Sequence, residues 1–155
     1  MTATAQRVFS PRVRNNQESR FEGTVDGIVY KANYFNLLME PHPDPIGDRL
    51  VVRVHHRASD LTYKQISIYI PANLEGGEHQ LARMNKNIFV DYVNYSDPEN
   101  PTAHKSVGGT LEFSFDEQSN SITGNLNAIM DNSGSDGGGT FAIAIIDFLV
   151  SGKQG

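Results

Sequence analysis

Residues 50–71 read LVVRVHHRASDLTYKQISIYIP, and this stretch decides the fold class. Apolar side chains alternate with mostly polar ones in two runs: Leu50, Val52 and Val54, then Ile66, Ile68 and Ile70. A period of two is typical of a strand with one buried face and one face in water. Pro71 ends the second run. The stretch therefore predicts two antiparallel strands joined by a short loop.

The same pattern continues outward in both directions. Asp26-Gly27 between apolar-bearing segments is a strong β-hairpin signal, and strand patterns follow at 28–40, 76–81, 88–95, 111–115, 122–130 and 140–150. No segment shows the period of an amphipathic helix. We therefore predict an all-β fold, a single antiparallel β-sandwich or barrel of eight to nine strands, mostly hairpin-connected.

Two segments carry more specific expectations. Residues 140–150 are apolar at both odd and even positions, so we expect a central strand covered on both faces. Six of the 14 glycines stand where the chain reverses, namely Gly27, Gly76, Gly77 and Gly137–Gly139, but Gly124 falls inside a strand pattern. A glycine there predicts a β-bulge or the close approach of another backbone segment.

Length and composition limit the class of protein. A chain of 155 residues is long enough for one domain with its own core. It has no cysteine, which excludes disulfides, thiolate nucleophiles and sulfur-ligated metal sites. No apolar run approaches the ~20 residues of a membrane-spanning helix, and Met1–Ser10 lacks the apolar core of a secretory signal. We expect a protein that is cytoplasmic, or exported without a visible signal peptide.

Charge divides the chain into two parts. Residues 1–20 hold four arginines and one glutamate, which gives this segment a net charge of +3. The net charge of the whole chain is −5, so residues 21–155 carry −8. We assign 1–20 as a basic N-terminal arm and 21–155 as the antiparallel β-domain. The arm is either a disordered terminus or a segment that docks on the acidic body of a neighbouring subunit. The acidic body argues against nucleic-acid binding.

Cross-strand pairing of the 50–71 segment suggests a ligand-binding surface. With Val54 opposite Ile68, the outward face places Arg53 opposite Tyr69 and His55 opposite Ser67. Arg53 could stack on the Tyr69 ring, and such a face could hold an anionic or polyhydroxylated ligand. Arg53, His55 and Tyr69 are the candidate ligand-binding residues, with an ordinary solvated strand face as the alternative.

Motifs for chemistry are weak throughout. His55 and His56 are adjacent and point to opposite faces of a strand, and the other histidines lack metal-ligand spacing. Residues 131–139 place oxygen-bearing side chains as a calcium loop does, but Asp136 stands where such a loop needs glycine. We expect a hairpin connection there, with calcium binding left open. No nucleophile elbow is present. We predict no catalytic residues, no metal site, no cofactor and no enzymatic activity.

Two short segments carry a family resemblance. Residues 23–32, GTVDGIVYKA, and residues 111–126, with LEFSFD and ITGNL, resemble the opening and late hairpins of small bacterial all-β domains of uncharacterised function, lipocalin-like or sandwich in form. The resemblance covers mainly turns, and it implies a fold rather than a function.

Two functions follow as expectations. The first is a non-catalytic binding or interaction module for a carbohydrate, lipid or protein ligand. It would present either a pocket lined by Tyr34, Tyr69 or Tyr92 or a flat aromatic face. The alternative is a structural subunit of a homo-oligomer or larger bacterial assembly, with the N-terminal arm docking on a neighbour.

Overall fold

The computed structural model describes residues 19–41, 47–83, 87–132 and 139–152, and these form an antiparallel all-β fold, as predicted. The predicted arm lies almost entirely outside these ranges, as do residues 133–138 of the calcium-like loop. The strands are β1 (Arg20–Val25), β2 (Ile28–Lys31), β3 (Tyr34–Glu40), β4 (Arg49–Arg57), β5 (Tyr63–Pro71), β6 (Gly77–Gln80), β7 (Phe89–Asn94), β8 (Thr102–Asp116), β9 (Ser121–Asp131) and β10 (Thr140–Ser151). Within these ranges no helix has the length and apolarity needed to span a membrane.

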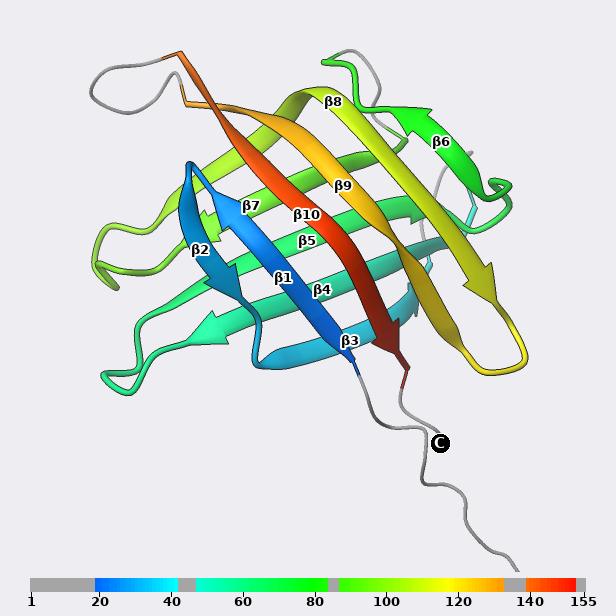
Figure 1. Cartoon of the computed structure of the whole chain (residues 1–155), viewed down its shortest axis with the longest axis horizontal. Coiled ribbons are helices and arrows are strands. Elements are labelled where there is room, and N and C mark those ends of the chain that lie inside the picture. The colour runs from blue at the N-terminus through cyan, green and yellow to red at the C-terminus, as the bar shows by residue number, and fades with distance from the viewer. Residues whose placement is uncertain (1–18, 42–46, 84–86, 133–138, 153–155) are drawn as a thin grey trace, which may run out of the picture.

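One curled sheet contains every strand. The order is β2-β1-β10-β9-β8-β7-β5-β4-β3, and β6 pairs with β8 beside that path. The sheet folds over so that β2, β1, β10 and β9 lie across from β7, β5, β4 and β3 (Figure 1). Among the described strands no ladder joins β2 to β3, so the hydrogen bonds form an open, curled sheet. The closed sandwich or barrel that we predicted is not seen.

The long strand β8 carries the sheet from one half to the other. Its first residues pair with β7, as in Lys105 with Asp91, and its later residues pair with β9, as in Leu111 with Leu126. The change occurs at a bulge between Ser106 and Gly108, which lets a strand bend sharply. Gly109 follows with a φ of 96°, and a side chain there would collide with the Asn127 carbonyl oxygen. Glycine is therefore required at this bend.

The core lies between the two halves of the sheet. Leu50, Val52 and Val54 of β4 point inward and are nearly or fully buried, as the alternation predicted. Phe21 and Phe148, from the opposite half, are fully buried with ring centroids 5.3 Å apart. The outward positions of the same strands are therefore free to carry polar and aromatic groups.

The predicted pairing between β4 and β5 is wrong by two residues. Val54 pairs with Ile66 rather than Ile68, and Arg53 lies opposite Ser67 rather than Tyr69. The connection between the strands is shorter than that pairing required, because Arg57 pairs with Tyr63 and the Ala58 N–H bonds to the Thr62 carbonyl at 2.9 Å. A shift of two leaves each side chain on its predicted face.

Three further expectations have clear outcomes. The hairpin at Asp26-Gly27 is confirmed: both residues have positive φ, 52° and 78°, as a two-residue turn of the favoured hand requires. Close backbone approach at Gly124 is also confirmed, since a side chain there would collide with the Glu112 carbonyl oxygen. The single segment predicted at 28–40 is instead two strands, because Ala32 bonds to β1 and Asn33 to β4.

The expectation that β10 is covered on both faces is wrong. β10 is central, between β1 and β9, but its outward side is open, and Ile146 is 85% exposed. A bulge beside Ile146 interrupts the pairing with both neighbours. The β-domain begins at least one residue earlier than predicted, because Arg20 already belongs to β1. The Arg20 guanidinium forms an ion pair with the Asp147 carboxylate at 2.7 Å.

Candidate functional site

The outward side of β3, β4, β5, β7 and the start of β8 combines cationic and aromatic side chains, and we call it the basic–aromatic face. On β4 the arginines stand four residues apart, which puts them on one side of the strand. Neighbouring strands supply the rest through cross-strand pairing. The face comprises Tyr34, Glu40, Arg49, Arg53, His55, Arg57, Tyr63, Ser67, Tyr69, Phe89, Asp91, Tyr95 and Lys105.

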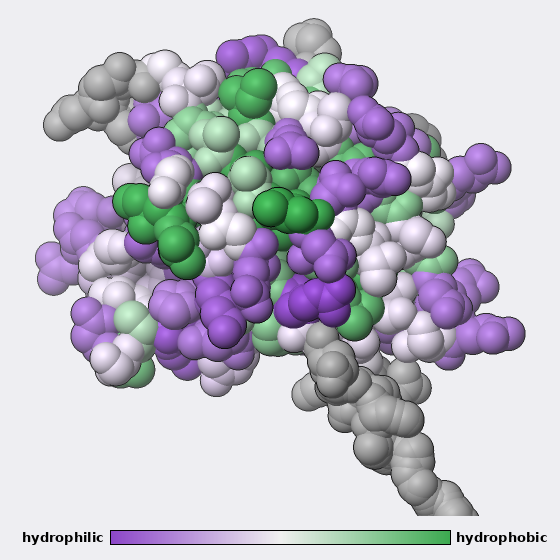
Figure 2. All heavy atoms as spheres, viewed as in Figure 1, coloured by the Kyte–Doolittle hydropathy of each residue, from purple (hydrophilic) through white to green (hydrophobic). Residues whose placement is uncertain are grey.

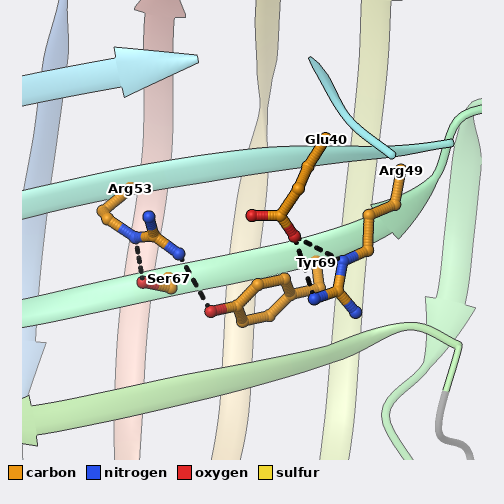
Figure 3. A network of polar contacts seen from close by, with 5 residues as sticks. All are labelled: Glu40, Arg49, Arg53, Ser67 and Tyr69. Atoms are coloured by element: carbon orange, nitrogen blue, oxygen red, sulfur yellow. Dashed lines mark hydrogen bonds and ion pairs between the residues drawn. The ribbon is translucent and has the colours of Figure 1, made fainter. Parts of the chain in front are cut away.

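Arg53 lies at the centre of this face, held by two hydroxyl groups (Figure 3). Its Nε donates to Ser67 Oγ at 3.1 Å, and one terminal nitrogen donates to the Tyr69 hydroxyl at 3.0 Å. Ser67 is almost fully buried, so this anchor is well fixed. Both partners are uncharged, so the guanidinium is oriented without direct neutralisation and keeps its attraction for an anion.

Arg49 is positioned differently. Its Nε and one terminal nitrogen both lie 3.0 Å from Glu40 Oε1, so a carboxylate offsets its charge (Figure 3). The Arg49 guanidinium carbon lies 4.5 Å from the centroid of the Tyr69 ring, and Phe89 stacks beside that ring at 4.7 Å. Cation–π contact of this kind stabilises a cation over an aromatic face. Tyr69 is therefore fixed between a stacked ring and two arginines.

Asp91 contributes a carboxyl group among these cations. It stands opposite Ser67 on one side and Lys105 on the other. Burial raises the pKa of the Asp91 carboxyl, and the charges of Lys105, Arg49 and Arg53 partly oppose that shift. With Arg57, the face has four cations against two carboxyl groups, Glu40 and Asp91. It is a positive surface on a body whose net charge is −8.

An aromatic ladder occupies the other end of the face. Tyr34 stacks on His55 with centroids 4.5 Å apart, His55 lies 5.1 Å from Tyr63, and Tyr63 stacks on Tyr95 at 4.4 Å. The Arg57 guanidinium lies 4.9 Å from the Tyr34 ring and 5.6 Å from the Tyr63 ring. The faces of these rings contact one another and the Arg57 guanidinium. A ligand would therefore contact the ring edges and the hydroxyl groups. The edge of an aromatic ring is its positive part.

His55 is the least satisfied polar group of the ladder. Its Nε2 is buried with no hydrogen-bond partner among the described residues. Burial lowers the pKa of the imidazole, and the nearby Arg57 charge lowers it further. His55 therefore favours the neutral form, in which the ring packs between Tyr34 and Tyr63 as an aromatic group.

The three candidate residues chosen from sequence all lie on the basic–aromatic face. Arg53 and Tyr69 are in direct contact, whereas His55 belongs to the aromatic ladder. Arg57 lies on this face, where the alternation also puts it, although it was not chosen as a candidate residue. Arg49 was not expected there, although its spacing of four residues from Arg53 indicates the same face. Sequence analysis also missed Tyr95, which no local pattern could place beside Tyr63. That contact depends on β7 pairing with β5, with β6 lying between them in the chain.

The other expected features are distributed elsewhere. Of the three tyrosines expected in a pocket, Tyr92 lines a cavity, whereas Tyr34 and Tyr69 lie on the basic–aromatic face. In the ranges that the structure describes, no three metal-ligating side chains come together.

Comparison with protein-family models finds no match for this chain, and comparisons with curated proteins and with solved structures find none either. The resemblance of the two hairpin segments to bacterial all-β domains therefore stays an expectation. Any assignment of function has to come from the geometry of the face itself.

Proposed function

We propose that the protein is a non-catalytic binding module and that the basic–aromatic face binds an acidic polysaccharide. The observation that carries this proposal is the row of arginines on β4, set among tyrosines on one outward face of an otherwise acidic protein. Arg53 and Tyr69 are the central ligand-contacting residues, and His55 supports the face by packing between Tyr34 and Tyr63.

Charge favours an anionic ligand. The two carboxyl groups of the face leave Arg53, Arg57 and Lys105 without a direct ion pair among the described contacts. Arg53 is already oriented by Ser67 and Tyr69, so little side-chain freedom is lost when it binds. A carboxylate or sulfate can accept two parallel hydrogen bonds from such a guanidinium.

The shape and chemistry of the face favour a sugar polymer. From Arg49 to Arg57 the arginines recur at about 13 Å along β4, so the row of arginines is about 26 Å long. An extended chain with repeated charges can engage several of them at once, which raises its avidity. Tyrosine hydroxyls can donate to and accept from sugar hydroxyls between the charged positions.

Titration calorimetry with polygalacturonate tests this proposal. We expect measurable binding by the wild-type protein. Binding should be about ten- to 150-fold weaker for Arg53→Gln and for Arg57→Gln, since a charge-assisted hydrogen bond contributes about 1.5–3 kcal/mol. Lys31→Gln is the matched control, because it removes one exposed positive charge from β2, outside the face. It should bind as the wild type does. Equal binding by all four proteins would refute the assignment.

Two further ligands test what the face recognises. Neutral dextran should not bind, because it lacks the charges that the arginines need. Single-stranded oligothymidylate offers charge and stacking bases, so tighter binding of that ligand than of polygalacturonate would replace the polysaccharide proposal with a nucleic-acid one. Tighter binding of dextran would overturn the role given to charge.

A second candidate function, a structural subunit of a homo-oligomer, rests on a different surface. Val29 of β2, Ile129 of β9 and Ile146 of β10 are 83%, 42% and 85% exposed on the outward side of the other half. Figure 2 shows a group of apolar side chains over β2, and separate apolar side chains over the middle of β10 and near the upper ends of β9 and β10. Such patches mark protein–protein contacts.

Light scattering tests the second candidate. A homo-oligomer would show a mass above the 17.1 kDa of one chain, and Ile146→Ser should lower that mass. Deleting residues 1–18 would show whether the arm takes part. A monomeric wild-type protein at all concentrations would remove this candidate.

A further inference from the structure

A cavity of about 310 Å³ lies between the β1–β2 hairpin and the strands β5, β7 and β8. Aromatic side chains form much of its wall, contributed by Tyr30, Tyr92, His104 and Phe141. The cavity is distinct from the basic–aromatic face, because Tyr30 and Tyr92 belong to the inward side of the sheet and are 4% and 5% exposed. Its volume falls in the range of small-molecule sites.

The aromatic wall is fixed by contacts between its own members. The His104 and Phe141 rings meet edge to face at 5.0 Å, and Tyr92 lies 5.7 Å from Phe141 and 6.0 Å from His104. The Tyr30 hydroxyl donates to the Lys64 carbonyl at 2.9 Å, which ties the hairpin to the opposite half of the sheet. The walls are therefore held in place before any ligand arrives, which lowers the cost of binding.

His104 lines the cavity and can offer it a hydrogen-bond acceptor. Its Nδ1 lies 2.9 Å from the Asp131 carbonyl oxygen, and a carbonyl can only accept, so Nδ1 carries a proton. In the neutral ring Nε2 is then an acceptor. Among the described residues none hydrogen-bonds to this Nε2, and unlike the Nε2 of His55 it is not a buried orphan.

Asp26 adds a second acceptor at the same place. It stands in the β1–β2 turn and lines the cavity. Burial raises the pKa of Tyr92 to about 12, and the nearby Asp26 charge contributes to that rise. The phenol of Tyr92 therefore stays protonated at neutral pH.

The cavity rim is apolar and uncovered on the side of β2, whereas Lys64, Asn94 and Thr102 contribute polar side chains to the lining. Ile28 and Val29 line this rim and are 66% and 83% exposed, two of the most exposed large apolar side chains of the described chain. Exposed apolar area of this size around a concave site is typical of a ligand-binding groove. A flat apolar molecule inserted between hairpin and sheet would cover both side chains.

We propose that this cavity binds a small, flat aromatic molecule that carries a hydrogen-bond donor of the indole N–H or phenol O–H kind. The ring lies among Tyr92, Phe141 and the apolar rim. Its donor bonds to Nε2 of His104. The site is independent of the basic–aromatic face and of any ligand bound there.

Calorimetry and ligand-observed NMR with indole, 1-methylindole and 2-naphthol test this proposal on the full chain. We expect indole to bind about three- to tenfold more tightly than 1-methylindole, since one hydrogen bond is lost on methylation. The fluorescence of 2-naphthol gives a second readout, because the protein has no tryptophan.

His104→Phe removes the acceptor and keeps an aromatic ring between Tyr92 and Phe141. It should bind indole and 1-methylindole equally. The matched control is His79→Phe, since His79 stacks on Phe113 at 5.4 Å in another part of the molecule, and this variant should keep the wild-type preference.

Two results would overturn the inference. One is the absence of binding of all three probes to the wild type. The other is an indole preference that is unchanged in His104→Phe or lost equally in His79→Phe. Loss of polysaccharide binding on the other face would leave these outcomes unaffected.

Discussion

Replacement of His55 by phenylalanine is expected to stabilise the protein, although His55 lies in the candidate site. The imidazole sits between the rings of Tyr34 and Tyr63, at 4.5 and 5.1 Å, and a phenyl ring keeps both contacts. What the substitution removes is a buried Nε2 that has no hydrogen-bond partner among the described residues. A buried polar atom without a partner costs free energy on folding.

The size of the gain follows from the burial of that one atom. An unsatisfied buried group costs about 1–3 kcal/mol. The His55 side chain as a whole is only partly buried, so the lower end applies, about 1 kcal/mol at neutral pH. For a chain of this length that corresponds to a rise in Tm of roughly 2–4 °C.

The gain should grow as the pH falls. Burial and the Arg57 charge hold the pKa of His55 below its ordinary value of 6.5 in the folded protein. As the pH falls through 6.5 the unfolded chain takes up a proton that the folded state resists, so the wild-type protein loses stability. Phenylalanine cannot be protonated, so the His55→Phe protein does not lose stability in this way.

Urea unfolding of both proteins at about pH 8 and about pH 5.5 measures the effect, since these values lie on either side of the ordinary histidine pKa. His79→Phe is the control, because its Nε2 already has a partner in the Glu75 carbonyl at 2.8 Å, so no gain is expected. A His55→Phe protein less stable than the wild type, or with the same pH dependence, would contradict the reasoning.

Three further substitutions test the fold by thermal or urea unfolding. Gly124→Ala should cost about 1–3 kcal/mol through collision with the Glu112 carbonyl, whereas Gly108→Ala, whose new methyl meets only a side chain, should be nearly neutral; equal effects would argue against the close approach. Tyr30→Phe should lower the free energy of unfolding by about 1 kcal/mol, because the hydrogen bond to the Lys64 carbonyl is lost. No change would mean that this hydrogen bond does not contribute to stability. Phe21→Ala should lower the free energy of unfolding by about 3–5 kcal/mol, because Phe21 is fully buried. A loss below 1 kcal/mol would show that neighbouring side chains move in to fill the space.

Local patterns predicted the elements of the fold well. Alternation identified β4, β5, β8 and β9, and Asp26-Gly27 identified the first hairpin, because these signals depend on neighbours within a few residues. The pairing of β4 with β5 failed by two residues, since the length of a loop depends on its own turn geometry. β8 was predicted too short, because the residues before Leu111 contain no regular alternation. The first four of them, 102–105, pair with β7, and the later ones pair with β9.

In the candidate site, too, local patterns placed some residues, and only the pairing of distant strands placed the others. Arg53 and Tyr69 could be placed on one face by period alone, and their contact survived the error in pairing, since the arginine reaches diagonally across to the tyrosine hydroxyl. Asp91, Lys105 and Tyr95 could not be placed, because they join the face only through strands distant in the chain.

The sequence by itself determined that this protein is an antiparallel all-β domain, which side of β4 and β5 is polar, and where the first hairpin turns. Those properties follow from side-chain period and backbone freedom, which are local. The tertiary structure decided that the sheet is open and curled, that β10 leaves Ile146 uncovered, and that four cations and an aromatic ladder share one face. It also formed the cavity beside His104. These features depend on the order in which distant strands hydrogen-bond, which no local pattern encodes.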